Sequence, residues 1–525
     1  MASALEPIVQ KDFSGGLNLS VNPYLIPKKQ LWRATNVLLD EHGSIRTRPG
    51  SALVRNDITT TAPLRYLKNL VKTDLSTVHW AIFYGSPGTG QIWTTDATPY
   101  TYIGGYTLPL DYFTPQAVTV YNQEFIALGY NTPKTFNGTT LADMVVQGGQ
   151  VLPLGAKHVA FHLGSIWLWN TASTTSTLDG PSSLRMAAVG KVDDWPSSNQ
   201  SFIAKDDGQV GMGLATYTIV ETGISPISTL VAFKNFSAYQ ISGVFGSTNF
   251  AIQQVKTDMG NIAPRSIQFV SGFGIVRLSH KGFALFNGVD DKLLSEDIRP
   301  AIFGNAQDER DILPLDFTNI DKACAGQVQN PPLYVCACPV AADFDGTPGN
   351  GNLTRYFVFD LVRKAWTICD FPIYASWIGT LYENGQGNLY AGENTQGGIF
   401  RLMGLNDTVD ARPGFSLGGT PVNWSFRTGP INSGDSTGLL FFRRLLLDMV
   451  YQQGQALNYN VTLNGYTSGL TGSRSLPLLV TAGRTDIDIM RTAPSIYATI
   501  SGSGNIRVRG LTWQVRKKPL TRATL

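Results

Sequence analysis

The chain has 525 residues, of which 43% are hydrophobic and 15% are charged, and its formal net charge is +3. So weak a net charge excludes strong electrostatic steering toward nucleic acid or an anionic membrane. Four cysteines are too few for a disulfide framework, and the most apolar stretch, residues 438–450, is interrupted by Arg443 and Arg444 and is too short to span a bilayer.

Residues 1–50 are interpreted as an N-terminal docking segment. Its first residues lack a basic stretch followed by an apolar core, so we expect no signal peptide and synthesis in a cytoplasm. Pro27 and the residues after it predict one short helix. Residues 36–48 predict a β-hairpin whose turn uses the positive φ that Gly43 allows. The segment cannot bury a core alone, so we expect it to pack on the rest of the chain or on a partner.

Residues 51–403 contain a loose repeat of apolar strand, turn and second strand, recurring every 35 to 60 residues or so. The tripeptide Phe136-Asn137-Gly138 returns as Phe286-Asn287-Gly288 at the same place in the unit. A period of about 40 to 50 residues is typical of a propeller blade. We therefore expect an all-β protein with a central β-propeller-like domain of six or seven blades; a pair of β-sandwiches is the alternative.

Further along the chain the pattern changes twice. Residues 290–304 have apolar residues at helical spacing and predict a short helix. Residues 404–419 resemble a linker, and residues 420–525 alternate as strands of a C-terminal β-sandwich, with a bulge expected at Gly510.

Residues 489–525 contain no acidic residue. Two interpretations stay open for this basic end: a solvated sheet face with a frayed tail, or a surface that faces DNA or an acidic partner. The candidate residues are Arg507, Arg509, Arg516, Lys517, Lys518 and Arg522.

Signatures of catalysis are missing from the sequence. It has no nucleophile elbow, no zinc-protease helix motif and no phosphate-binding loop. His158 and His162 lie on an expected strand and face the same way, about 13 Å apart. All four cysteines, Cys324, Cys336, Cys338 and Cys369, are expected to be reduced core thiols. We therefore expect no enzyme, no catalytic residue, no cofactor and no metal.

The N-terminal segment, together with the repeats and the terminal sandwich, resembles the tail nozzle and hub proteins of short-tailed bacteriophages. Residues 13–50 have the family's Gly-Gly opening, its Asn-Val strand and its hairpin closed by Pro-Gly, and residues 277–298 resemble a propeller strand pair of such virion proteins. The segment's candidate assembly residues are Phe13, Gly15, Gly16, Asn36, Arg46, Arg48 and Pro49. They would fix the start of the chain on its own propeller or on the adaptor, or simply close the scaffold.

The resemblance implies a structural virion protein in the phage tail, assembled in the host bacterial cytoplasm. Such proteins form a ring, usually a homohexamer, below the head–tail adaptor and portal complex. The ring is a conduit and gate for ejection of double-stranded DNA, which passes without sequence-specific binding, and it carries tail fibres or spikes.

Two alternatives remain open. A carbohydrate-binding or host-recognition propeller would expose aromatic residues such as Trp93, Trp195 or Trp377 on blade loops. A propeller glycosidase would bring two carboxylates together across a sugar.

Overall fold

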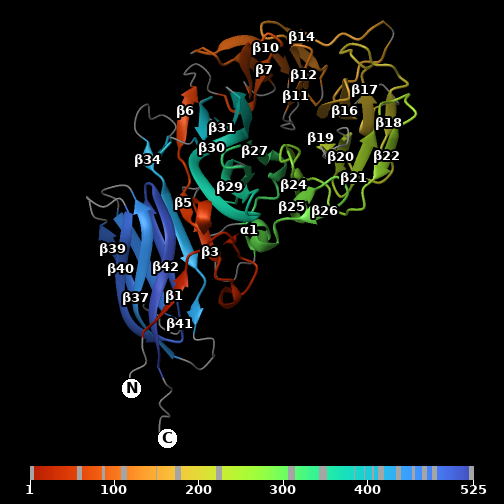
Figure 1. The fold of residues 1–525 in the computed structure, drawn as a ribbon. Helices are drawn as coiled ribbons and strands as arrows, with labels where there is room; N and C mark the ends of the chain where they lie inside the picture. The colour runs from red at the N-terminus through yellow and green to blue at the C-terminus, as the bar shows by residue number, and fades with distance from the viewer. Residues whose placement is uncertain are drawn as a thin grey trace.

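The fold is a β-propeller joined to a β-sandwich, and Figure 1 shows the two side by side. No helix among the described residues is both long and apolar enough to cross a membrane. The computed structural model describes residues 5–55, 62–84, 89–97, 99–107, 115–129, 131–148, 150–171, 179–219, 227–304, 314–341, 352–383, 385–394, 397–404, 407–411, 419–432, 439–451, 456–463, 470–475 and 482–518.

Five blades of the propeller are separate antiparallel sheets of four strands each, taken in chain order. The first two are β7 (Leu64–Val71), β8 (Thr77–Tyr84), β9 (Thr89–Thr94) and β10 (Thr101–Thr107), then β11 (Gln116–Val120), β12 (Gln123–Ala127), β13 (Lys134–Phe136) and β14 (Leu141–Asp143). The next two are β15 (His158–His162), β16 (Ser165–Thr171), β17 (Gly180–Met186) and β18 (Gln200–Phe202), then β19 (Gly211–Ile219), β20 (Ile227–Lys234), β21 (Ala238–Ser242) and β22 (Ala251–Gln254). The fifth is β23 (Gln268–Val270), β24 (Gly274–Ser279), β25 (Gly282–Phe286) and β26 (Asp291–Leu293).

Two further blades share one long strand, β30 (Ala365–Glu383). Its first part pairs with β29 (Leu353–Asp360), which continues to β28 (Leu333–Pro339) and β27 (Cys324–Val328). Its second part pairs with β31 (Gln386–Glu393), which continues to β32 (Ile399–Leu402) and then to β6 (Ser51–Arg55). The strand from the start of the propeller thus completes its last blade, and the described strands form seven blades.

The ring is closed because the innermost strands of neighbouring blades touch all the way round, with β30 and β31 against β7 at the closure. Apolar side chains fill the spaces between blades. Between the first two blades, Trp80 packs on Phe136 with ring centroids 5.9 Å apart, and Ile126 belongs to the same buried cluster. Each small sheet therefore buries both faces against its neighbours, which confirms the propeller over the pair of sandwiches.

The repeated Phe-Asn-Gly tripeptide forms the same turn in both blades that contain it. Asn137 Oδ1 accepts hydrogen bonds from the backbone N–H groups of residues 139 and 140, and Asn287 Oδ1 accepts them from residues 289 and 290. Gly138 and Gly288 both have φ of 98°. An Asn side chain that mimics a backbone turn, followed by a glycine at positive φ, forms the reversal from the third strand to the fourth.

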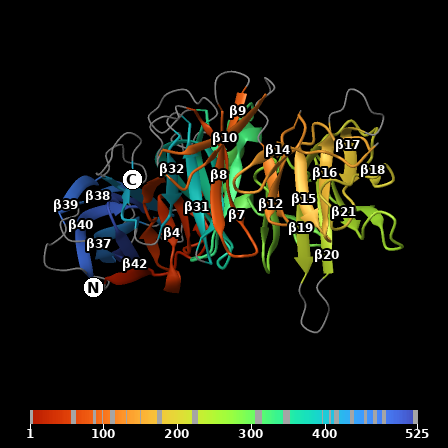
Figure 2. The ribbon, with the colours of Figure 1, turned by 90° about the horizontal axis from the view of Figure 1, so that it is seen from above.

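The sandwich has two sheets, and strands from both ends of the chain enter each of them. One sheet contains β1 (Glu6–Gln10), β4 (Val37–Leu39), β5 (Ile45–Thr47), β42 (Ile506–Lys518), β37 (Leu439–Tyr451) and β40 (Ala482–Ala493). The other contains β2 (Gly16–Leu17), β3 (Gln30–Thr35), β35 (Asn423–Thr428), β36 (Ile431–Asn432), β41 (Ser495–Ser503), β38 (Ala456–Leu463) and β39 (Leu470–Ser475). Seen from above, the sandwich lies at one end of an elongated molecule (Figure 2).

The N-terminal segment is therefore part of the sandwich rather than a unit beside it. The hairpin of β4 and β5 forms as expected, with Val37 opposite Thr47, the short 3-10 turn η2 (Glu41–Gly43) between the strands, and Gly43 at φ of 75°. The expected bulge in β42 is also present, because the register with β37 shifts between Gly510 and Val508.

The prediction of a helix after Pro27 is wrong. Residues 30–35 form β3, which pairs with β35 on one side and touches β30 of the propeller through Thr35 and Ile368. Leu31 is fully buried, and Trp32 packs edge-on against Tyr497 at 5.2 Å. Pairing on both edges and burial of these side chains outweigh a weak local preference for helix. The described helix nearby is the 3-10 turn η1 (Pro23–Leu25).

The helix expected at residues 290–304 is only partly present. Strand β26 uses its first residues, the 3-10 turn η3 (Glu296–Ile298) follows, and α1 (Arg299–Phe303) is a single turn with Pro300 at its start. A further 3-10 turn, η4 (Ile320–Lys322), leads into β27. Part of the predicted linker is also structured, because β33 (Val409–Asp410) runs parallel to β6 and pairs with β34 (Thr420–Pro421). Residues 405–406 and 412–418 of that linker lie outside the described part.

The four cysteines are free and buried, as expected. Cys336 and Cys338 face the same side of β28 with their Sγ atoms 3.7 Å apart. His158 and His162 are likewise buried on β15. Among the described residues there is no group of three or more His, Cys, Asp and Glu side chains placed to hold a metal ion.

Candidate functional site

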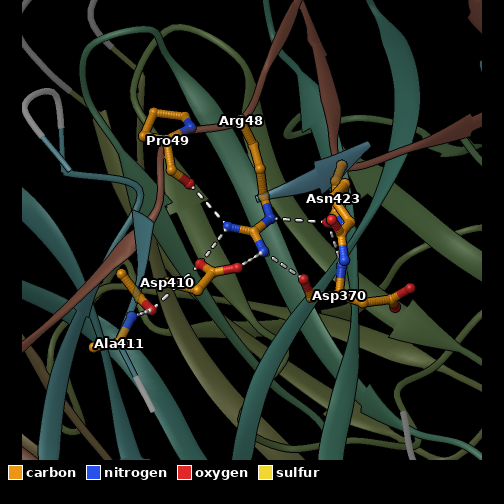
Figure 3. Close-up of polar contacts among 8 residues, drawn as sticks. Arg48, Pro49, Asp370, Asp410, Ala411 and Asn423 are labelled. Carbon is orange, nitrogen blue, oxygen red and sulfur yellow. Dashed lines mark hydrogen bonds and ion pairs between the residues drawn. The ribbon is translucent and has the colours of Figure 1, made fainter. Parts of the chain in front are cut away.

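Three of the N-terminal candidate residues, Asn36, Arg48 and Pro49, meet at a buried junction between the propeller and the sandwich. Arg48, which follows β5, is 0% exposed and lies at its centre (Figure 3). Its guanidinium donates to Asp410 through Nη1 and Nη2, at 2.8 and 2.7 Å from the two carboxylate oxygens. The remaining donors reach Asn36 Oδ1 at 2.8 Å, the Pro49 carbonyl at 3.0 Å and the Asp370 carbonyl at 2.6 Å.

Every N–H of this guanidinium therefore has an acceptor, since an arginine side chain offers five. The plane also stacks on Phe371, with its central carbon 3.7 Å from the ring centroid. A buried arginine is tolerated only when its charge is paired and its donors are all used. The acceptors lie at the two ends of the hairpin, on β30 and on β33. One side chain therefore joins the N-terminal segment to the propeller and to the segment that connects the propeller to the C-terminal strands of the sandwich.

Asn36 extends the junction. It has φ of 57°, a conformation that asparagine tolerates better than most residues. Its Oδ1 also accepts from the backbone N–H of Asp370 at 2.8 Å, and its Nδ2 donates to the carbonyl of Asn423 in β35 at 2.7 Å. Asn36 therefore bridges the propeller strand and the first strand of the C-terminal half of the sandwich.

The other N-terminal candidates are packing residues. Phe13 is fully buried in the sandwich core, 6.4 Å from the ring of Phe426. Gly16 has φ of 62°, and a Cβ there would lie 2.7 Å from the carbonyl oxygen of Trp366 in β30. A Cβ on Gly15 would meet Gln30 Cγ at 2.6 Å. Gly16 thus lets the chain pass close to the propeller, and Gly15 lets it pass close to the start of β3.

Arg46 and the basic candidates of β42 lie outside this junction. Arg46 and Arg507 face each other across β5 and β42, and Arg507 is ion-paired with Asp40. Arg509 and Lys517 are exposed, while Arg516 lies over the Phe441 ring at 5.4 Å. Lys518 is the last residue of β42, and its side chain, like Arg522, lies outside the described part.

A second polar cluster, which the sequence reading missed, joins the first blade to the last. His79 on β8 is 2.6 Å from Asp96 through Nδ1 and 3.0 Å from Glu383 through Nε2. Arg55 of β6 and Tyr390 of β31 also bind Glu383. Burial by itself lowers the pKa of His79, but the hydrogen bonds to Asp96 and Glu383 outweigh it and raise the pKa. The hydrogen bond from His79, helped by that from Tyr390, lowers the pKa of Glu383 to about 2.

The tryptophans named for a carbohydrate surface are not exposed. Trp195 and Trp377 are 1% and 5% exposed, and Trp93 is half-buried against Tyr102 at 5.2 Å. Asp410, Asp370 and Asn423 were missed by the sequence reading, because each lies more than 300 residues from its partner and no local pattern marks it.

Comparison with known proteins adds little to this geometry. No protein-family model matches the chain, and no curated protein matches it. Matching solved structures include the Pan2 WD40 domain of Neurospora crassa, at 9% identity, with 68% of this chain and 95% of that chain covered and a TM-score of 0.35. PorZ, a surface component of the type-IX secretion system of Porphyromonas gingivalis, has 9% identity, coverage of 73% and 42%, and a TM-score of 0.36.

Some of the similar structures are glycoside hydrolases. The exo-beta-1,3-galactanase of Phanerochaete chrysosporium has 8% identity, coverage of 89% and 100%, and a TM-score of 0.25. Likenesses this distant carry no argument about activity. The assignment of the fold rests on the sheets themselves.

Proposed function

We propose that the protein is a structural subunit of a virion, the tail nozzle or hub of a short-tailed bacteriophage. In this role copies of the chain form a ring, a hexamer by the family pattern, below the head–tail adaptor. The ring conducts and gates double-stranded DNA during ejection and holds fibres or spikes on its outside. The role is mechanical and involves no covalent step, and the subunit is assembled in the host cytoplasm.

The observation that carries the proposal is the place of the N-terminal motif in the fold. Domains of one chain move relative to one another by default, because their interfaces are small and polar. Here the junction around Arg48 and Asp410 is buried and fully hydrogen-bonded, and β3 bridges the sandwich to the propeller through Thr35. A subunit that bears load while DNA passes needs such a rigid connection. The residues that resemble the nozzle family are the ones that make it.

The test is single-particle imaging of the purified protein together with its native mass. The proposal expects a ring of about six copies around a channel wide enough for duplex DNA. A protein that stays monomeric in both measurements at every concentration, with or without virion extract, would contradict it. A ring with no axial channel would contradict the conduit while leaving the assembly intact.

A further inference from the structure

A cleft of about 490 Å³ lies where the sandwich meets the segment that leaves the last blade. Its walls come from the hairpin, from the ends of β37 and β42 that face it, and from residues 407–408. The size is in the range of small-ligand sites, which occur preferentially at the contacts between domains. The lining contains charged side chains, namely Asp40, Arg46, Asp407 and Arg507, and mainly apolar ones, namely Pro49, Val450, Tyr451 and Ile506, together with uncharged polar residues.

Two arginines of this cleft lie side by side. Arg46 of β5 and Arg507 of β42 are register partners, so their side chains project from the same face of the sheet. Like charges directly opposite each other on neighbouring strands are destabilising. Such a pair is favourable only where anionic groups lie between or beside the two guanidinium groups.

The acidic residues of the lining supply only part of the required negative charge. Asp407 is bound by Arg401, with contacts of 2.9 and 3.2 Å to Nη2 and Nε. Asp40 forms its ion pair with Arg507. Burial raises the pKa of Asp40, but the hydrogen bond from Arg507 and the nearby charge of Arg46 lower it overall, so this carboxylate already serves both arginines.

Arg46 is left with an unused donor. Its Nε is buried and has no hydrogen-bond partner in the described part of the protein. A buried donor without an acceptor is destabilising. Arg46 and Arg507 together with Asp40 leave one positive charge in the cleft, next to apolar walls.

We propose that this cleft binds a single carboxylate, presented by an acidic residue of a partner protein with an apolar residue beside it. The carboxylate accepts from Arg46, and the apolar neighbour packs on Val450 and Ile506. One unit of positive charge is balanced by one carboxylate, whereas a doubly charged phosphate would leave one negative charge without a counter-charge in the cleft. The wall that contains Pro49 is held by the Arg48 junction, so the site is formed before its ligand arrives.

The experiment uses two small probes that differ by one charge, N-acetyl-leucyl-glutamate amide and N-acetyl-leucyl-glutamine amide. Binding to the full-length protein is measured by calorimetry at low salt. We expect the acidic probe to bind, and the neutral probe to bind at least about tenfold more weakly. Arg46→Met should weaken the acidic probe by about tenfold or more, since it removes the charge and keeps much of the volume. Arg509→Met is the matched control, because Arg509 is exposed on the same strand outside the cleft.

Thermal unfolding shows whether Arg46→Met is folded. The second variant is Val450→Phe, which fills the cleft and leaves both arginines in place. Equal binding of the two probes would overturn the proposal, and so would equal binding to wild type and to either cleft variant. The absence of binding up to roughly 10 mM probe, weaker than any specific site of this size, would do the same. Displacement of the acidic probe by inorganic phosphate or by a short DNA duplex at lower concentration would also overturn the proposal, because it would show that the site selects phosphate over a carboxylate.

Discussion

Arg48 and Asp410 are 362 residues apart in the chain and form a bidentate, buried ion pair. Asp410 also accepts from the hydroxyl of Ser51 at 3.4 Å and lies beside it, because β33 runs parallel to β6. The pair therefore joins the strand that enters the propeller to the strand that leaves it. The strand that completes the last blade and the segment that leads into the sandwich therefore meet at one place in the fold.

Arg48→Met is expected to destabilise the protein by about 3–5 kcal/mol, because it leaves the Asp410 carboxylate buried without a counter-charge. The measurement is the shift of the urea unfolding midpoint. Asp410→Asn in the same background should recover part of the loss, since the uncompensated charge is then gone.

Arg443→Met is the control for this prediction, because Arg443 is an exposed arginine on β37. Its midpoint should stay close to that of the wild type, as surface substitutions usually change stability by less than about 0.5 kcal/mol. Equal effects of Arg48→Met and Arg443→Met would show that the junction is not a stabilising contact.

Gly16→Ala is expected to lower the thermal midpoint by several degrees, as a cost of about 1–3 kcal/mol does in a large domain. The added Cβ meets the Trp366 carbonyl at 2.7 Å, and the backbone keeps φ of 62°. Gly148→Ala is the matched control, since no atom lies within 4 Å of its Cβ position and its φ is not in the left-handed region. A Gly16→Ala midpoint no lower than that of Gly148→Ala would refute the close contact with β30.

The sequence predicts features whose cause is local. The turn at Asn287 needs only its own side chain and the glycine after it, so the repeated tripeptide identified the same reversal in two blades. The hairpin after Asn36 is similar, because its glycine and its alternation lie within a dozen residues.

The parts that the sequence does not predict depend on distant partners. The Arg48 junction needs Asp410 and Asp370, and no periodicity links them. The residues after Pro27 form β3 instead of the expected helix, because one edge of this segment is paired by β35, almost 400 residues later in the chain, and the other touches β30. The cluster around His79 could not be predicted from the sequence for the same reason, because its residues come from the first and the last blade.

His158 is expected to make the protein acid-labile. Burial lowers its pKa to about 4, against 6.5 for the free side chain, and its Nε2 lies 3.0 Å from the carbonyl of Gly211. Below pH 6.5 His158 is therefore protonated in the unfolded chain, whereas in the folded protein it stays neutral until the pH falls to about 4. Stability falls through this window as the pH falls, by up to about 3 kcal/mol, and His162 adds to the fall in the same direction.

The measurement for His158 is the free energy of unfolding of the wild type and of His158→Gln at about pH 7 and about pH 4.5. Glutamine keeps an N–H for Gly211 and does not titrate. The difference between the two proteins should shift in favour of the variant at the lower pH. A constant difference would mean that His158 is not held neutral by its burial.

His79 is expected to have the opposite pH dependence. Its pKa is raised in the folded protein by Asp96 and Glu383, against the lowering effect of burial and of the nearby Arg55. The contribution of His79 to stability is therefore fully present below its unfolded pKa of 6.5 and is lost as the pH rises through the higher folded value. Because the ring is partly exposed to solvent, we expect an effect below about 1 kcal/mol.

His79→Gln should thus destabilise the protein more at about pH 6 than at about pH 8.5, and the comparison of its unfolding midpoints with those of His158→Gln checks the sign. Destabilisation that grows with pH would show that the cluster does not hold a charged imidazole at the contact between the first and last blades.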